Sequence, residues 1–184
     1  MKLLTTIYRH EKVNTEGKTF FREAVRGIIF RNTPPGTTAG ASEKELLMIY
    51  SPVNRDYKFP GGGIDAGESH LEALRRELNE ECGATLKEVT GEFGKTIEYA
   101  HAIEDIFDTY KQISYYYFCE INDGLAENNL EDYEEALGFR PEWVDVESAL
   151  VQNKKVLAES SAVPKWIKRE CFVLDILKKK MQRR

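Results

Sequence analysis

Residues 58–84 read KFPGGGIDAGESHLEALRRELNEECGA and contain the clearest local signals in the chain. Apolar side chains recur every three or four residues from Leu71 to Cys82, which predicts a helix with one buried stripe. Ser69 and Glu72 have the spacing of a capping box at the helix start, and Gly83 stands where a left-handed cap would end it. The segment therefore predicts a glycine-rich turn followed by a well-bounded helix.

Three carboxylates lie close together on this helix. At 100° per residue, Glu77, Glu80 and Glu81 fall within an arc of about 100°, and like charges at this spacing repel one another. A hard divalent cation such as Mg²⁺ prefers oxygen ligands and would neutralise the cluster. The upstream glycines allow the backbone to come close and to turn a carbonyl towards the same ion. A solvated helix face is the alternative that the glutamates alone leave open.

The same segment resembles the Nudix box, whose pattern is G-x5-E-x7-R-E-U-x-E-E-x-G-U with U a bulky apolar residue. All fixed positions of that pattern agree, and only the final residue departs, because alanine is smaller than the usual aliphatic side chain. The matching residues are Gly62, Glu68, Arg76, Glu77, Leu78, Glu80, Glu81, Gly83 and Ala84.

The resemblance implies a divalent-metal centre. Glu77 and Glu81, one helical turn apart, would be the main ligands, and Glu80 and the Gly62 carbonyl would complete sites for further ions. The expected cofactor is Mg²⁺, with Mn²⁺ as the other candidate.

Arg76 has two expected roles. The resemblance implies that it orients a glutamate by an ion pair, with Glu68 supporting it from the loop. Its spacing also allows a surface ion pair with Glu72, and the two roles are compatible.

A carboxylate base is needed to take a proton from the attacking water. In the family this base comes either from the box, here Glu77, or from a later loop. The acidic segment offers Glu134 and Glu135 for that purpose, and we slightly favour the loop.

Substrate identity must be encoded outside the box. Arg26, like Arg22 and Arg55, is a candidate to contact a phosphate. Tyr99 stands near the place where ADP-ribose-cleaving relatives carry a proline, which is more similar to the dinucleoside polyphosphate group. We expect a Mg²⁺-dependent hydrolase that cleaves the pyrophosphate bond of a nucleoside diphosphate linked to a group X. Nucleoside triphosphates, dinucleoside polyphosphates and nucleotide sugars remain open.

Two other classes compete with the hydrolase. A ligand-sensing domain of the same fold would lack turnover, but decay of the box is expected there and this box is intact. Isopentenyl diphosphate isomerase resembles the fold and uses a cysteine and a glutamate. Cys82 lies within the apolar stripe of the helix, which does not suit that role.

The rest of the chain predicts mixed strands and helices without regular alternation, which favours an α+β fold. The resemblance specifies an α/β/α sandwich around a mixed β-sheet. Strands are expected at 3–8 and 19–31, joined as a first hairpin, and a loop at 32–42. We expect one domain over residues 1–184, with the box at 62–84 and an extra C-terminal helix at about 164–182. Further strands are expected at 45–50, 86–98, 110–121 and 139–144, and a helix at 146–157.

Net charge, cysteine content and the lack of long apolar runs limit the kinds of binding partner that we expect. A formal net charge of -5 argues against a general nucleic-acid binder, so we expect a small nucleotide substrate and no specific nucleic acid. Three cysteines without metal-ligand spacing suit reduced thiols in the cytoplasm. No apolar run reaches the roughly 18 residues of a membrane span, so no membrane partner is expected. The assembly is expected to be a monomer or a homodimer.

Overall fold

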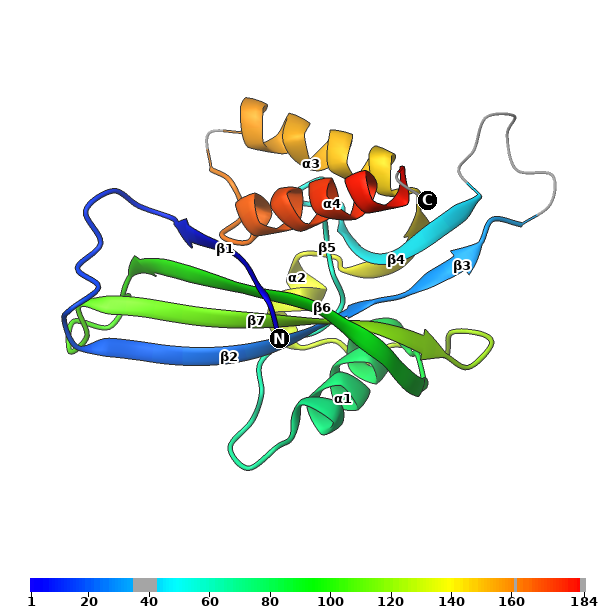
Figure 1. Ribbon diagram of the computed structural model, residues 1–184, viewed down its shortest axis with the longest axis horizontal. Helices are drawn as coiled ribbons and strands as arrows, with labels where there is room; N and C mark the ends of the chain where they lie inside the picture. Colours follow the sequence, from blue (N-terminus) through cyan, green and yellow to red (C-terminus); the bar gives the residue numbers. More distant parts are fainter. Residues whose placement is uncertain (35–42, 161, 183–184) are drawn as a thin grey trace.

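Two four-stranded sheets and four helices make up the computed structural model, which describes residues 1–34, 43–160 and 162–182 (Figure 1). One sheet has the strand order β1-β6-β7-β2, and the other has the order β3-β4-β5 with β8 paired to β4. The strands are β1 Leu3–Tyr8, β2 Thr19–Ile28, β3 Phe30–Asn32, β4 Lys44–Ser51, β5 Asp56–Lys58, β6 Leu86–His101, β7 Thr109–Ile121 and β8 Arg140–Val144. The helices are α1 His70–Cys82, α2 Asp132–Ala136, α3 Val146–Glu159 and α4 Ile167–Met181.

The helices lie on two sides of the sheets. Helix α1 lies on one side, and α3 and α4 lie together on the other (Figure 1). Strand β4 shows how one strand supplies both cores: Leu46 and Met48 belong to the cluster that contains the buried faces of α3 and α4. Leu47 and Ile49 belong to the cluster that contains the leucine stripe of α1. The predicted α+β fold with an α/β/α sandwich is confirmed.

The predicted helix after the glycine turn is confirmed with both of its caps. The Ser69 hydroxyl accepts from the Glu72 backbone N–H, and the Glu72 carboxylate accepts from the Ser69 N–H. Gly83 has a φ of 61°, the left-handed conformation expected at this cap. Ala84 is fully buried against the α1 core, so the smaller residue is accommodated there.

The expected first hairpin is wrong. Strand β1 pairs in parallel with β6, and β2 pairs in parallel with β7. A turn signal at Gly17 indicates where the chain reverses but does not determine which strand becomes the partner. The long β6–β7 hairpin offers edges on both sides, and each early strand takes one of them.

Other differences concern the boundaries of expected elements and two short elements that were not expected, β5 and α2. The expected strand over 19–31 is divided into β2 and β3, and the C-terminal helix begins at Ile167, after Pro164. The short helix α2 lies in the acidic segment, where no helix was predicted. The expected loop at 32–42 lies mostly outside the described residues. No helix in the described ranges is long and apolar enough to cross a membrane.

Candidate active site

Arg76 of α1 organises the carboxylates of the box. Its guanidinium donates to both oxygens of Glu68, at 2.9 and 2.8 Å, and to the Gly63 carbonyl at 2.9 Å. It also donates to Glu77 Oε1 at 2.8 Å and to Glu80 Oε2 at 3.1 Å. One arginine therefore connects the glycine turn, the loop and the helix face.

The alternative pairing of Arg76 with Glu72 is not formed among the described contacts. Glu72 instead closes the capping box, where its Oε2 accepts from the Ser69 N–H at 2.8 Å. This use of Glu72 leaves the arginine free to turn towards the loop carboxylate.

Glu81 lies at the buried centre of the site. Its Oε1 accepts from the Lys58 ammonium at 2.5 Å, and its Oε2 accepts from the Gly61 backbone N–H at 2.7 Å. Burial raises the pKa of Glu81 to about 7; Glu134 and Glu77 act in the same direction, whereas Lys58 opposes them. The carboxylate is held between the strand β5 lysine and the glycine turn.

Glu77 lies against the second glycine of the turn. A Cβ at Gly62 would overlap the Glu77 carboxylate, so a larger residue there would displace that carboxylate from the turn. Burial raises the pKa of Glu77, although Arg76 and Arg26 favour its ionised form. The Gly62 carbonyl accepts from the Val25 N–H at 3.0 Å, and an oxygen lone pair remains for a further contact.

The two candidate loop bases differ in their surroundings. Glu134 of α2 is buried; its Oε1 accepts from the Tyr133 hydroxyl at 2.8 Å and lies 3.5 Å from the Lys58 ammonium. Burial opposes ionisation of Glu134, but Lys58 and a hydrogen bond with Glu81 outweigh it, and the pKa is lowered. Glu135 is exposed. The structure thus brings Glu134, and not Glu135, to the carboxylate cluster.

In donor type these residues suit a hard divalent cation, but no group of three or more described Asp, Glu, His or Cys side chains is already arranged to hold a metal ion. Glu77, Glu81 and Glu134 are buried carboxylates, Glu77 and Glu134 both raise the pKa of Glu81, and Gly62 of the glycine turn lies against the Glu77 carboxylate. Oxygen is the only donor type in this set, as Mg²⁺ and Mn²⁺ prefer. Lys58 forms an ion pair with Glu81, and Arg76 forms one with Glu77. Binding of a divalent cation would require these ion pairs to rearrange.

A cavity of about 280 Å³ opens beside the glycine turn. Gly61 and Gly62 line it, together with Tyr133, Trp166 and the carboxylate of Glu131. Its charge is dominated by six cationic side chains: Arg9, Arg22, Arg26, Lys58, Lys165 and Arg169. Such a cavity is suited to the phosphates of an anionic ligand.

Helix α4 contributes Arg169 to the lining of this cavity. Arg169 donates to Glu98 at 2.6 Å and to Glu170 at 2.6 Å, and all three side chains are almost fully buried. Glu170 also accepts from the Phe59 N–H at 3.2 Å, two residues before Gly61. The C-terminal helix therefore fixes the backbone that enters the glycine turn.

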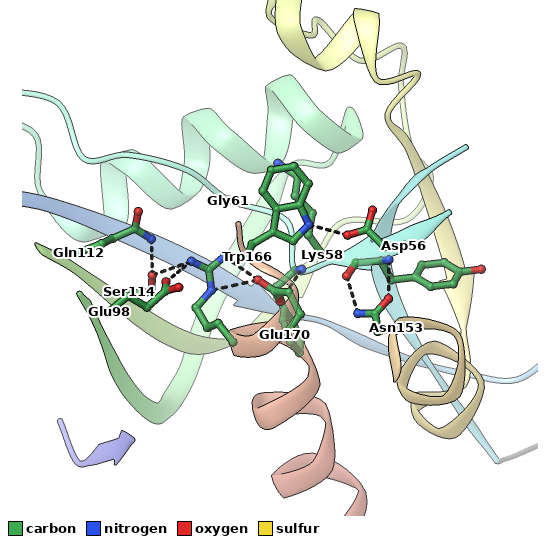
Figure 2. Close-up of polar contacts among 12 residues, drawn as sticks. Asp56, Lys58, Gly61, Glu98, Gln112, Ser114, Asn153, Trp166 and Glu170 are labelled. Carbon is green, nitrogen blue, oxygen red and sulfur yellow. Dashed lines mark hydrogen bonds and ion pairs between the residues drawn. The ribbon is translucent and has the colours of Figure 1, made fainter. Parts of the chain in front are cut away.

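A second contact joins the residue before α4, Trp166, to strand β5. Its indole N–H donates to Asp56 at 2.6 Å (Figure 2). Burial raises the pKa of Asp56 to about 6; the nearby Glu170 adds to this effect, whereas the Trp166 hydrogen bond and Lys58 oppose it.

The two expected substrate contacts have different positions. Arg26 of β2 is buried in the wall of the cavity, and its Nε has no hydrogen-bond partner among the described residues. Tyr99 of β6 lies outside the residues that line the cavity and stacks on Tyr8 with ring centroids 5.4 Å apart. Alternation along β6 turns its neighbour Glu98 towards Arg169 instead.

Several site residues were missed from the sequence. Lys165, Trp166 and Arg169 come from a segment that carries no recognisable motif, and only tertiary packing brings them together with Lys58. The one available signal was the position of Lys58, immediately before the Phe-Pro-Gly turn.

Comparison with known proteins assigns the family. The NUDIX domain model matches residues 22–166, which is most of the chain. The chain belongs to the Nudix family. The expectation from the box is thereby confirmed, and this Nudix chain extends beyond the matched region at both ends, where Arg9 and Arg169 lie.

Its curated relatives include RNA pyrophosphohydrolases. One from Nitratiruptor sp. is 49% identical over 54 residues, covering 29% of this chain and 35% of the relative. One from Campylobacter jejuni is 32% identical over 116 residues, covering 61% of this chain and 71% of the relative. A third, from Sulfurovum sp., is 34% identical, covering 46% of this chain and 50% of the relative. The match thus spans half or less of two of these relatives.

Solved structures also resemble this Nudix chain. A MutT Nudix hydrolase from Burkholderia pseudomallei aligns with a TM-score of 0.46 and 15% identity, covering 83% of this chain and 96% of that one.

Proposed function

We propose that the chain is a divalent-cation-dependent pyrophosphohydrolase that cleaves a phosphoanhydride bond of a nucleotide substrate. The observation that carries this proposal is the position of the carboxylate cluster. Glu77, Glu81 and Glu134 are buried beside the glycine turn, and the turn opens into the cationic cavity. Metal ligands and phosphate-binding groups are therefore adjacent.

The proposed ligands of Mg²⁺ or Mn²⁺ are Glu77 and Glu81, with Glu80 and the Gly62 carbonyl as further donors. A divalent ion held there polarises phosphoryl oxygens and lowers the pKa of a bound water. Arg76 keeps Glu77 and Glu80 in position through its hydrogen bonds, and Glu68 holds Arg76 in turn.

Glu134 is the proposed general base. It takes a proton from water as the water oxygen bonds to phosphorus, and the phosphorus–oxygen anhydride bond breaks with the electron pair leaving on the departing phosphate. Its lowered pKa keeps the carboxylate ionised at neutral pH, and the Tyr133 hydroxyl fixes one of its oxygens. Glu77 is the alternative base, and Glu135 is disfavoured because it is exposed.

Cations in the cavity hold the substrate phosphates. Arg26 is suited to this role because its buried Nε has no hydrogen-bond partner within the described part of the chain. Arg169 lines the same wall, although its carboxylate partners already satisfy much of its charge. Charge-assisted hydrogen bonds from such groups stabilise the negative charge that develops on the transferred phosphoryl group.

Candidate substrates are nucleoside triphosphates, dinucleoside polyphosphates, nucleotide sugars and the 5′-triphosphate end of RNA. The last follows from the name of the curated relatives. It is compatible with an acidic chain, because an RNA end is held through its phosphates in a local cationic cavity rather than along an extended basic surface.

A substrate panel with and without Mg²⁺ tests the proposal. We expect release of phosphate or pyrophosphate from at least one substrate only when the cation is present. Failure of the wild-type chain with every substrate would favour the ligand-sensing alternative. The isomerase alternative is disfavoured by Cys82, which is fully buried and whose pKa is raised by burial.

A further inference from the structure

Three cationic side chains lie at the junction of two cavities. Arg9, just after β1, Arg22 of β2 and Lys165, just before α4, line both the cavity beside the glycine turn and a neighbouring cavity of about 520 Å³. We call these residues the junction cluster. Arg9 lies outside the matched NUDIX region, whereas Arg22 and Lys165 lie within it at its two ends, so one residue of the cluster comes from beyond the matched region.

The junction cluster has more positive charge than its own partners neutralise. Arg9 is paired with Glu98, which Arg169 also uses. Neither Arg22 nor Lys165 has a side-chain hydrogen bond or an ion pair in the described parts of the chain. Burial lowers the pKa of Lys165, and the nearby cations of Arg9, Arg22 and Arg169 lower it further. The side chains of Arg22 and Lys165 are exposed, and like charges gathered at this surface favour the approach of an anion.

On one side, the junction cluster lies in the same cavity as the proposed reaction centre. The cavity that reaches the cluster is also lined by Gly61 and Gly62. A Cβ at Gly63 would lie 2.9 Å from Arg22 Nη2, so the arginine lies directly on the glycine turn. The unpartnered, buried Nε of Arg26 belongs to the same cavity. A ligand bound at the turn can therefore extend to the junction cluster without leaving cationic surroundings.

The other side of the cluster is aromatic. Phe20 and Tyr110 stack with ring centroids 6.0 Å apart, and His10 and His101 stack at 5.0 Å. All four rings line the larger cavity, and Phe20 remains 38% exposed. Flat, partly exposed rings next to a phosphate site provide surfaces on which a nucleobase can stack.

We propose that the junction cluster binds a phosphate of a second nucleotide, beyond the nucleotide that carries the scissile anhydride, and that the aromatic cavity receives the base of that second nucleotide. This inference rests on the proposed function and narrows its substrate class to molecules with two nucleotides. Dinucleoside polyphosphates and 5′-triphosphorylated oligonucleotides share this chemistry. A single nucleoside triphosphate would fill only the glycine-turn end.

Binding can be measured by calorimetry in EDTA, where hydrolysis does not proceed. The ligands are ATP, diadenosine tetraphosphate and a 5′-triphosphorylated dinucleotide. We expect the wild-type chain to bind at least one of the two-nucleotide ligands about 10-fold or more tighter than ATP, as a charge-assisted contact provides. Lys165→Gln and Arg22→Gln should reduce that ratio at least about five-fold. Lys155→Gln, on the exposed side of α3, is the charge-matched control and should preserve it.

Each outcome has one meaning. The subsite is supported if a two-nucleotide ligand binds the wild type more tightly than ATP does and Lys165→Gln removes this difference. If the affected ligand is the triphosphorylated dinucleotide, the cluster binds a phosphodiester; if it is diadenosine tetraphosphate, the cluster binds a distal phosphate of the polyphosphate chain. Equal affinity of all three ligands for the wild type, or equal losses for ATP and the longer ligands, would overturn the subsite. Restoring Mg²⁺ then tests turnover separately: binding without hydrolysis would refute the proposed function while leaving the subsite intact.

Discussion

The Lys58 ammonium lies 2.5 Å from Glu81 Oε1, so strand β5 places a positive charge inside the carboxylate cluster of the Nudix box. Both side chains are almost fully buried, and the same ammonium is 3.5 Å from Glu134. In the absence of a divalent ion, this lysine is the main compensation for Glu81 and Glu134. If the carboxylate cluster binds a divalent ion as proposed, the metal-bound protein should depend on Lys58 less than the metal-free protein does.

Replacing Lys58 should expose this dependence. We expect Lys58→Gln to lower the free energy of unfolding in EDTA by about 3 kcal/mol, because breaking a buried ion pair leaves uncompensated charge. Added Mg²⁺ should then raise the melting temperature of the variant more than that of the wild type. Lys87→Gln breaks the exposed pair with Glu120 and should leave the free energy of unfolding almost unchanged. Equal stability of Lys58→Gln and the wild type in EDTA would contradict this account.

Glu81→Gln tests the proposed metal ligand. We expect kcat to fall at least about 10²-fold, because a charged oxygen donor is lost while the side chain keeps its size. Calorimetry should show weaker Mg²⁺ or Mn²⁺ binding in parallel, and circular dichroism should show an intact fold. Glu88→Gln, at an exposed position of β6, serves as the control. Turnover close to normal in Glu81→Gln would refute the ligand role.

The identity of the base can be decided by paired substitutions in α2. Glu134→Gln should lower kcat by about 10²-fold or more and remove the acidic limb of the pH–rate profile, because the proton acceptor is lost. Glu135→Gln changes an exposed neighbour and should leave kcat within about two-fold. Unchanged profiles in both variants would assign the base to Glu77.

Asp56 should make stability depend on pH. Its pKa is about 6 in the folded chain against 3.8 for the free side chain, so its contribution to stability is full below about pH 4 and is lost as pH rises through 6. Asp56→Asn can still accept the Trp166 hydrogen bond without a charge. We expect the variant to gain about 2 kcal/mol relative to the wild type between pH 4.5 and 7.5, at ~1.4 kcal/mol per unit. Urea denaturation in EDTA measures this difference, and a constant difference across that range would disprove it.

We propose that residues 1–184 form one cooperative domain that includes α4. Glu170 is fully buried between Arg169 and the Phe59 N–H, so Glu170→Ala should cost about 3 kcal/mol or more. Unfolding should remain a single transition when tryptophan fluorescence and circular dichroism are compared. Lys178→Gln, which removes an exposed ion pair to Glu147 of α3, should cost less than about 1 kcal/mol. Separate unfolding of α4 would show that it is an appendage.

The sequence predicts local features of this fold well. The capping box, the leucine stripe and the glycine cap depend on residues a few positions apart, and each is present in the structure. Strand partners were not predictable in the same way, because β-branched and aromatic residues identify a strand without specifying its neighbour. The short helix α2 was missed because its acidic residues resemble those of a solvated loop.

The candidate site also contains residues that were predictable from local sequence and residues that were not. Box residues such as Glu77 and Glu81 are arranged by one helix, so their spacing places them on one face. Lys58, Trp166 and Arg169 reach the site from strand β5 and the α4 region, and their roles depend on contacts across more than 70 residues of sequence, such as that between Arg169 and Glu98. A lysine or an arginine in such segments has no distinguishing pattern.

The parallel pairing of β2 with β7 joins residues far apart in the chain, as in the pair Thr19 and Thr109. Closing so large a loop costs chain entropy before any contact compensates for it, and domains rich in such distant pairings fold slowly. The carboxylate helix α1 lies within that loop and can form early from its own caps. Arg26 belongs to β2 and reaches its place only when the sheet closes, so catalytic competence should emerge late in refolding, after most helical signal has recovered.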